Sequence, residues 1–164
     1  MTPLWPHIAI LGFVTAQRLV ELPIARANTA RLLSIGGREV APGHYPFIVA
    51  MHAAWLASLW LFALGRPINL AFLILFGLIE LARLWVLRSL GNRWTTRIIT
   101  VPGEQLVARG PYKFVSHPNY LVVIAELAVL PLVFGLWQIA LIFTALNAAI
   151  LTVRIRAENA ALGR

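Results

Sequence analysis

Long apolar runs separated by short polar segments dominate the sequence. The runs lie at residues 4–22, 46–65, 67–87, 121–134 and 136–153. A helix needs about 20 apolar residues to cross the hydrocarbon layer of a bilayer, although roughly 17 suffice. The pattern therefore predicts an all-α integral membrane protein with about five transmembrane helices. The fourth run is the shortest of the five, and it contains Glu126 and Pro131.

The spacing of the runs predicts how the chain is organised. A chain of 164 residues is expected to form one domain. Residues 1–87 would supply three N-terminal spans, and residues 88–164 a polar loop followed by a C-terminal helical hairpin. Only a residue or two around Gly135 separates the last two runs, so these helices should be antiparallel neighbours.

Composition and charge favour a membrane over a nucleic-acid partner. Hydrophobic residues make up 60% of the chain and charged residues 12%, whereas a soluble domain carries about 25% charged residues. The net charge of +8 comes from arginines placed between apolar runs, not from one soluble basic face. Positive residues bias loops to the cytoplasm. Segments 23–45, 88–116 and 154–164 hold almost all of them, which predicts an inner (plasma) membrane protein with an outside N-terminus and a cytoplasmic C-terminus.

Polar residues that could carry chemistry gather after the third run. Residues 95–101 are rich in β-branched side chains and precede Pro102–Gly103, so extended chain and a turn are expected there. His117 and Pro118 suit the start of the fourth helix, because proline fits a first helical turn. A helix start of this kind favours an anionic group such as a carboxylate.

The predicted hairpin brings distant residues to one membrane surface. Arg154 and Glu158 lie four residues apart on one face of the last helix. The end of that helix and the start of the fourth should lie side by side, so we expect His117, Tyr120, Arg154 and Glu158 to converge.

Each of these residues also has a structural alternative. His117 could cap the fourth helix, Tyr120 could be an interfacial anchor, and Arg154 and Glu158 could form a solvated ion pair. Glu80 and Arg83, inside the third run, could pair to fix helix packing. No phosphate-binding loop and no HExxH pair occur in the sequence, so neither a nucleotide site nor a metal site is expected.

Two motifs resemble the isoprenylcysteine carboxyl methyltransferase family. They are GEQLVARGPYKFVSHPNYL and, about 35 residues later, RIRAENAAL. The N-terminal RLVEL, RANTARLL, GGREV and GHYP segments are similar to the shorter bacterial branch, some members of which methylate long-chain alkylpyrones or alkylresorcinols.

The resemblance implies a methyl donor and a set of residues for it. The donor would be S-adenosylmethionine, bound between the loop and the last two helices. The residues carried over as its lining are Glu104, Gln105, Leu106, Val107, Tyr112, His117, Pro118, Asn119, Tyr120 and Glu158. Arg154 would contact the acceptor. Two departures, Asn159 and Arg97, stand where the family has an acidic residue and a glutamine, and they disfavour a prenylcysteine acceptor.

The expected function is O-methyl transfer to a lipophilic acceptor, entering from the membrane at its cytoplasmic face. Positioning of two reactants would supply most of the catalysis. Arg154 could hold a carboxylate acceptor, whereas a phenol or enol would need a base, for which Glu158 is the candidate. Two alternatives remain open: a non-catalytic membrane scaffold or lipid-binding protein, and a phospholipid amine N-methyltransferase.

Overall fold

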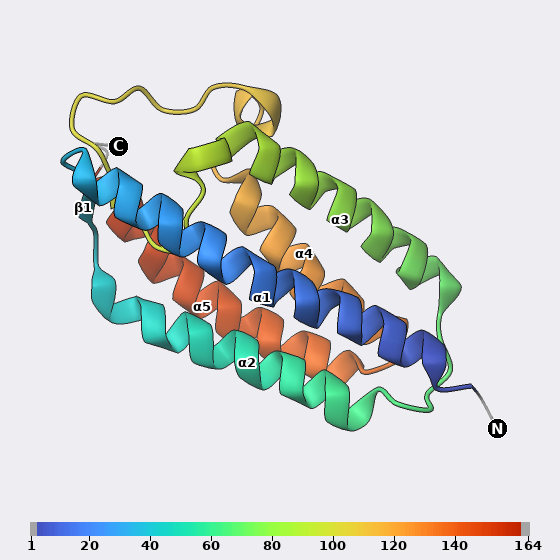
Figure 1. Ribbon diagram of the computed structural model, residues 1–164. Helices are drawn as coiled ribbons and strands as arrows, with labels where there is room; N and C mark the ends of the chain where they lie inside the picture. The colour runs from blue at the N-terminus through green and yellow to red at the C-terminus, as the bar shows by residue number, and fades with distance from the viewer. Residues whose placement is uncertain (1–2, 162–164) are drawn as a thin grey trace.

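The computed structural model describes residues 3–161 and consists almost entirely of helices (Figure 1). In chain order the elements are α1 (Trp5–Ser34), β1 (Arg38–Glu39), η1 (Pro42–His44), α2 (Tyr45–Phe62), α3 (Leu70–Leu90), η2 (Gly91–Arg93), β2 (Ile99–Thr100), η3 (Gly110–Lys113), α4 (Pro118–Val133) and α5 (Trp137–Ala161). Among the described residues, α1, α3, α5 and the η1–α2 segment are long and apolar enough to cross a membrane. The predicted all-α membrane fold is therefore confirmed.

Helix α4 is the shortest of the five and the most enclosed. Its 16 residues span about 24 Å at 1.5 Å per residue, less than the roughly 30 Å hydrocarbon layer. Half of its side chains are buried, because α4 lies between α3 and α5 and behind α1 (Figure 1). A tight turn at Gly135, with φ +68°, connects it to α5 and forms the predicted hairpin.

Helix α1 runs further than the sequence pattern indicates. The apolar run ends at Leu22, but the helix continues through Pro23 to Ser34. Buried residues recur on one face beyond the proline, at Ala25, Asn28 and Leu32. Asn28 Nδ2 donates to the carbonyl of Trp94 over 2.8 Å. Tertiary contacts thus extend the helix through a residue that would otherwise weaken it, and the predicted loop 23–45 is shorter than expected.

Four charged side chains form a buried ion cluster inside the bundle: Arg18, Glu21, Arg83 and Glu126. Arg83 donates to both carboxylates, over 2.5 and 2.8 Å to Glu21 and over 2.6 and 2.7 Å to Glu126. Arg18 Nη2 also donates to Glu126, over 2.5 Å. The cluster therefore ties α1, α3 and α4 together.

The alternative that Glu80 pairs with Arg83 is wrong. Glu80 accepts a hydrogen bond from Gln17 Nε2 over 2.8 Å instead. Glu21 on α1 meets the Arg83 guanidinium in paired geometry, with Nε and Nη2 donating to its two oxygens. Glu126 on α4 accepts from Nη1 with both oxygens, so carboxylates from two facing helices engage Arg83.

A two-stranded antiparallel ribbon closes the end of the bundle at which α1, α3 and α5 finish. Arg38 pairs with Thr100 and Glu39 with Ile99. The expectation of extended chain at residues 95–101 is confirmed for β2, and a turn follows at Gly103 with φ +76°. The ribbon fastens the polar loop after α3 to the chain segment between α1 and α2.

Candidate active site

The start of α4 presents two ring side chains side by side. His117 is the residue before Pro118, and its backbone carbonyl accepts hydrogen bonds from the N–H groups of Tyr120 and Leu121. Its imidazole makes no capping hydrogen bond, so the capping alternative does not describe the side chain. The ring instead stacks on that of Tyr120, with 5.2 Å between the centroids.

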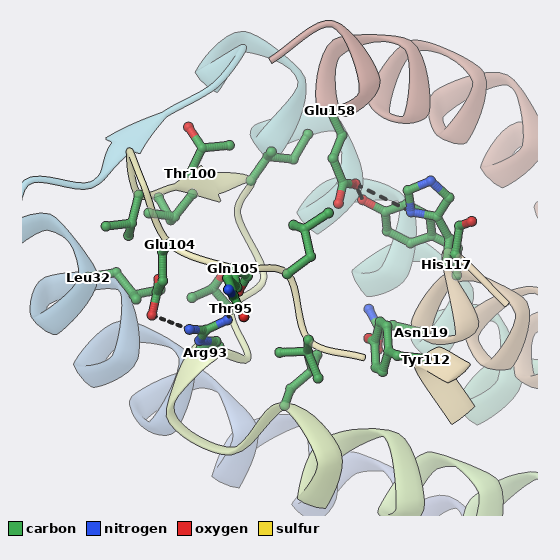
Figure 2. Close-up of a pocket in the computed structure, with 18 of the residues that line it drawn as sticks. Leu32, Arg93, Thr95, Thr100, Glu104, Gln105, Tyr112, His117, Asn119 and Glu158 are labelled. Atoms are coloured by element: carbon green, nitrogen blue, oxygen red, sulfur yellow. Dashed lines mark hydrogen bonds and ion pairs between the residues drawn. The ribbon is translucent and has the colours of Figure 1, made fainter. Parts of the chain in front are cut away.

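The end of α5 meets these rings from the opposite side. The Tyr120 hydroxyl donates to Glu158 Oε2 over 2.5 Å and accepts from Arg154 Nε over 3.0 Å. His117 Nδ1 lies 3.8 Å from the same Glu158 oxygen (Figure 2). The predicted convergence of His117, Tyr120, Arg154 and Glu158 is therefore confirmed as geometry, and we call these residues the cavity cluster.

Arg154 and Glu158 are coupled through Tyr120, and no direct ion pair joins them in the described part of the chain. Arg154 is buried, and its Nη2 donates to the carbonyl of Thr96 over 2.9 Å. The alternative of a solvated pair is wrong for Arg154, because the guanidinium is enclosed between α5, the loop before β2 and the Tyr120 ring.

The loop after α3 forms the other wall of the site. Arg93 donates to the backbone carbonyl of Gln105 over 2.5 Å and forms an ion pair with Glu104. Further along, Gly110 has φ +59° and packs so closely on Ser89 that an added Cβ would lie 2.1 Å from its hydroxyl. Contacts at residues 104–105 and at Gly110 thus hold the loop against η2 and the end of α3.

These walls enclose a cavity of about 360 Å³, within the usual range of small-molecule sites. In Figure 2 the Arg93–Glu104 pair and the His117–Glu158 pair lie on opposite sides of it. The predicted site residues that line it are Glu104, Gln105, Leu106, Val107, Tyr112, His117, Asn119, Tyr120, Arg154 and Glu158. Pro118 is buried in the first turn of α4 and does not line it.

Sequence reasoning missed a substantial part of the lining. The additional residues are Leu32, Leu90, Arg93, Thr95, Ile98, Ile99, Thr100, Val101, Lys113, Phe114, Val115 and Ser116, while Arg97, noted above for its departure from the family pattern, also lines the cavity. Leu32 reaches the cavity only because α1 continues past Pro23. The β-branched residues 95–101 predicted extended chain there, but nothing in their pattern indicated that this segment lines a cavity.

Both carboxylates and basic side chains line the cavity, and the phenol of Tyr112 is neutral. Burial, and secondly the negative charge of Glu158, raise the pKa of Tyr112 above its ordinary value. Tyr112 therefore stays protonated at neutral pH, and its hydroxyl can donate a hydrogen bond. In the described residues there is no group of three or more histidine, cysteine, aspartate or glutamate side chains that could hold a metal ion.

Fold and site together define a helical membrane protein with a polar cavity built from a loop and a C-terminal helical hairpin. The sequence model of the isoprenylcysteine carboxyl methyltransferase (ICMT) family matches residues 70–164, which include α3, the loop and the hairpin. The chain is also 40% identical over 165 residues to Uncharacterized protein YpbQ of Bacillus subtilis (strain 168), covering 96% of this chain and 95% of that protein. No solved structure matches. The chain belongs to the isoprenylcysteine carboxyl methyltransferase family, and this membership indicates a membrane methyltransferase.

Proposed function

We propose that this protein is an S-adenosylmethionine-dependent O-methyltransferase acting on a lipophilic acceptor at the cytoplasmic membrane face. One observation carries the proposal. The Tyr120 hydroxyl links Glu158 and Arg154 at one wall of the cavity, and loop residues 104–107 line the same cavity. A carboxylate, a guanidinium and a histidine ring thereby face one enclosed space.

The cavity lining suits the charges of the donor. S-adenosylmethionine carries a sulfonium and an ammonium together with a carboxylate. The lining offers Glu104 and Glu158 as anions and Arg93 and Lys113 as cations. Leu106, among the apolar loop residues, could contact the adenosine. When bound, the donor would supply an electrophilic methyl group on a positively charged sulfur, which leaves as a neutral thioether.

The residues of α5 would act on the acceptor. Arg154 would hold the acceptor oxygen by a charge-assisted hydrogen bond. An acceptor carboxylate needs no further help, because it already carries the electron pair that forms the new C–O bond. A phenol or enol acceptor must lose its proton, and Glu158 would take it. Tyr120 would orient both side chains through its hydroxyl.

The membrane supplies a route for the acceptor's tail. Many large apolar side chains on the outer faces of the helices are exposed, among them Leu61, Leu78 and Leu141. A lipid-tailed acceptor could therefore reach the cavity laterally, while the polar donor arrives from water. We favour an alkylated polyketide phenol or pyrone over a prenylcysteine-like carboxylate, since Arg97 and Asn159 depart from the family pattern. The cytoplasmic orientation rests on the arginine-rich polar segments.

Calorimetric titration of the detergent-purified protein with S-adenosylmethionine and with its demethylated product tests the donor site. Both should bind, and Glu158→Ala and His117→Ala should weaken binding. Arg156→Ala is the matched control, because Arg156 is exposed on the same helix turn and does not line the cavity. Absence of binding to folded protein would favour a non-catalytic scaffold.

Incubation of the protein with labelled donor and three acceptors tests the transfer itself. The acceptors are a long-chain phenol, a prenylcysteine and a phosphatidylethanolamine. Label in the phenol is expected. Label in the amine headgroup alone would contradict the proposed O-methyl transfer and identify the protein as an N-methyltransferase.

A further inference from the structure

A second cavity lies behind the loop that walls the first one. It has a volume of about 470 Å³ and lies where α1, η2 and residues 105–109 meet. Three arginines line it, namely Arg31, Arg93 and Arg109, and no carboxylate is found among its described lining residues. Figure 1 shows this loop passing over the ends of α1 and α3.

Two of the three guanidinium groups retain donors for a ligand. Arg31 lies in the last turn of α1, is exposed, and forms no ion pair with any described residue. Arg109 uses its Nε to donate to the carbonyl of Ser89 over 2.8 Å, and no described carboxylate pairs with it. Only Arg93 is engaged by an anion, Glu104. Arg31 and Arg109, which no described carboxylate engages, suit a phosphate, because guanidinium groups bind phosphate in paired geometry.

The rest of the lining is amphipathic. Leu90, Leu106, Val107 and Ala108 supply apolar contacts beside Asn92 and Gln105. The cavity also lies at the end of two membrane-length helices, where lipid headgroups meet the protein surface. A ligand that combines a phosphate with an apolar body matches both features.

We propose that this cavity binds the headgroup of an anionic phospholipid, with Arg31 and Arg109 as the principal phosphate contacts. The site is distinct from the cavity cluster, because Glu158, Arg154 and His117 do not line it. The proposal does not rest on the proposed function, since lipid binding can be measured without a methyl donor. A lipid bound here would brace the loop whose Gln105, Leu106 and Val107 line both cavities.

Native mass spectrometry of the detergent-purified full chain, titrated with phosphatidylglycerol, measures this binding. Arg31→Gln should weaken it about tenfold, as expected for one charged hydrogen bond. Arg31→Lys, which keeps the charge, should lose only about threefold. Arg26→Gln is the matched control, because Arg26 is an exposed arginine on the same helix that does not line the cavity. Thermal unfolding of all variants confirms that they are folded.

Three outcomes would overturn the proposal. Equal loss in Arg26→Gln and Arg31→Gln would mean general surface charge and no defined site. Equal binding of phosphatidylcholine would remove the requirement for an anionic lipid. Inorganic phosphate that displaces phosphatidylglycerol at similar concentration would assign the cavity to a free anion instead.

Discussion

The buried ion cluster and the cavity cluster both contain arginine and glutamate side chains, but the glutamates differ in how many hydrogen bonds they accept and how exposed they are. In the buried cluster, Glu126 accepts from two arginines and is 1% exposed. In the cavity cluster, Glu158 accepts a hydrogen bond from the Tyr120 hydroxyl, and its side chain is 25% exposed. The first carboxylate is buried among its arginine partners and closed to a ligand, whereas the second lines the cavity, and no described hydrogen-bond donor meets its Oε1.

The position of an ionisable residue in the fold therefore decides whether it stabilises the bundle or remains available to a ligand. Charges within the bundle must be paired, because an unpaired charge away from water is costly. Charges where a loop meets a hairpin can stay partly unpaired, since water or a ligand can complete them. Arginine–glutamate pairs inside a membrane protein therefore do not by themselves mark a site.

Glu126→Gln should produce the largest effect. It removes the charge shared by Arg83 and Arg18 and leaves both guanidinium groups undercompensated inside the bundle. We expect a loss of about 3–5 kcal/mol of stability, as for breaking one side of a buried pair. Thermal and denaturant unfolding in detergent micelles would measure it. Glu158→Gln serves as the control and should leave stability nearly unchanged; an equal loss would erase the contrast between the clusters.

Glu158→Gln should instead weaken donor binding. Loss of a charged hydrogen-bonding group costs about 1.5–3 kcal/mol, or roughly 10- to 100-fold in affinity. Calorimetry with S-adenosylmethionine would show it. Arg156→Gln is the control, because Arg156 is exposed on the same helix and does not line the cavity. Donor affinity unchanged in Glu158→Gln would remove this residue from the donor site.

Tyr120→Phe tests the hydroxyl that couples Arg154 to Glu158. It removes two hydrogen bonds and keeps the ring that stacks on His117, so we expect about a fivefold to tenfold fall in methyl-transfer kcat/KM. Tyr45→Phe is the matched control: its hydroxyl bonds to Thr96 Oγ1 over 3.2 Å and the residue does not line the cavity. Equal loss in both variants would indicate general loosening of this end of the bundle.

Arg97→Gln should have the smallest effect. Arg97 donates to Glu39 over 2.7 and 2.9 Å and lies 4.2 Å from the centre of the Tyr45 ring. Its side chain is 36% exposed, so water screens the pair and a stability change below about 1 kcal/mol is expected. A double-mutant cycle with Glu39→Gln would isolate the interaction. A coupling energy between Arg97 and Glu39 as large as the stability loss expected for Glu126→Gln would show that the ribbon is also essential to the fold.

The membrane class, the hairpin and the members of the cavity cluster are all predictable from the sequence alone. Apolar runs of spanning length report directly on burial in lipid, which is a one-dimensional property. The short connection at Gly135 requires α4 and α5 to be antiparallel, which by chain connectivity alone places His117 and Tyr120 beside Arg154 and Glu158. In an antiparallel pair, residues that are equally far from the connecting turn lie side by side.

Tertiary structure alone decided the partners of Arg83, the length of α1 and the missed walls of the cavity. Arg83 could pair with Glu80 by helical spacing, but the choice of Glu21 and Glu126 depends on which faces of α1 and α4 meet α3. Pro23 is a local reason to end α1, and contacts of Asn28 and Leu32 with distant segments override it. Pairings between elements far apart in the chain carry no periodic signal, so the ribbon and the second cavity emerge only when the helices are packed.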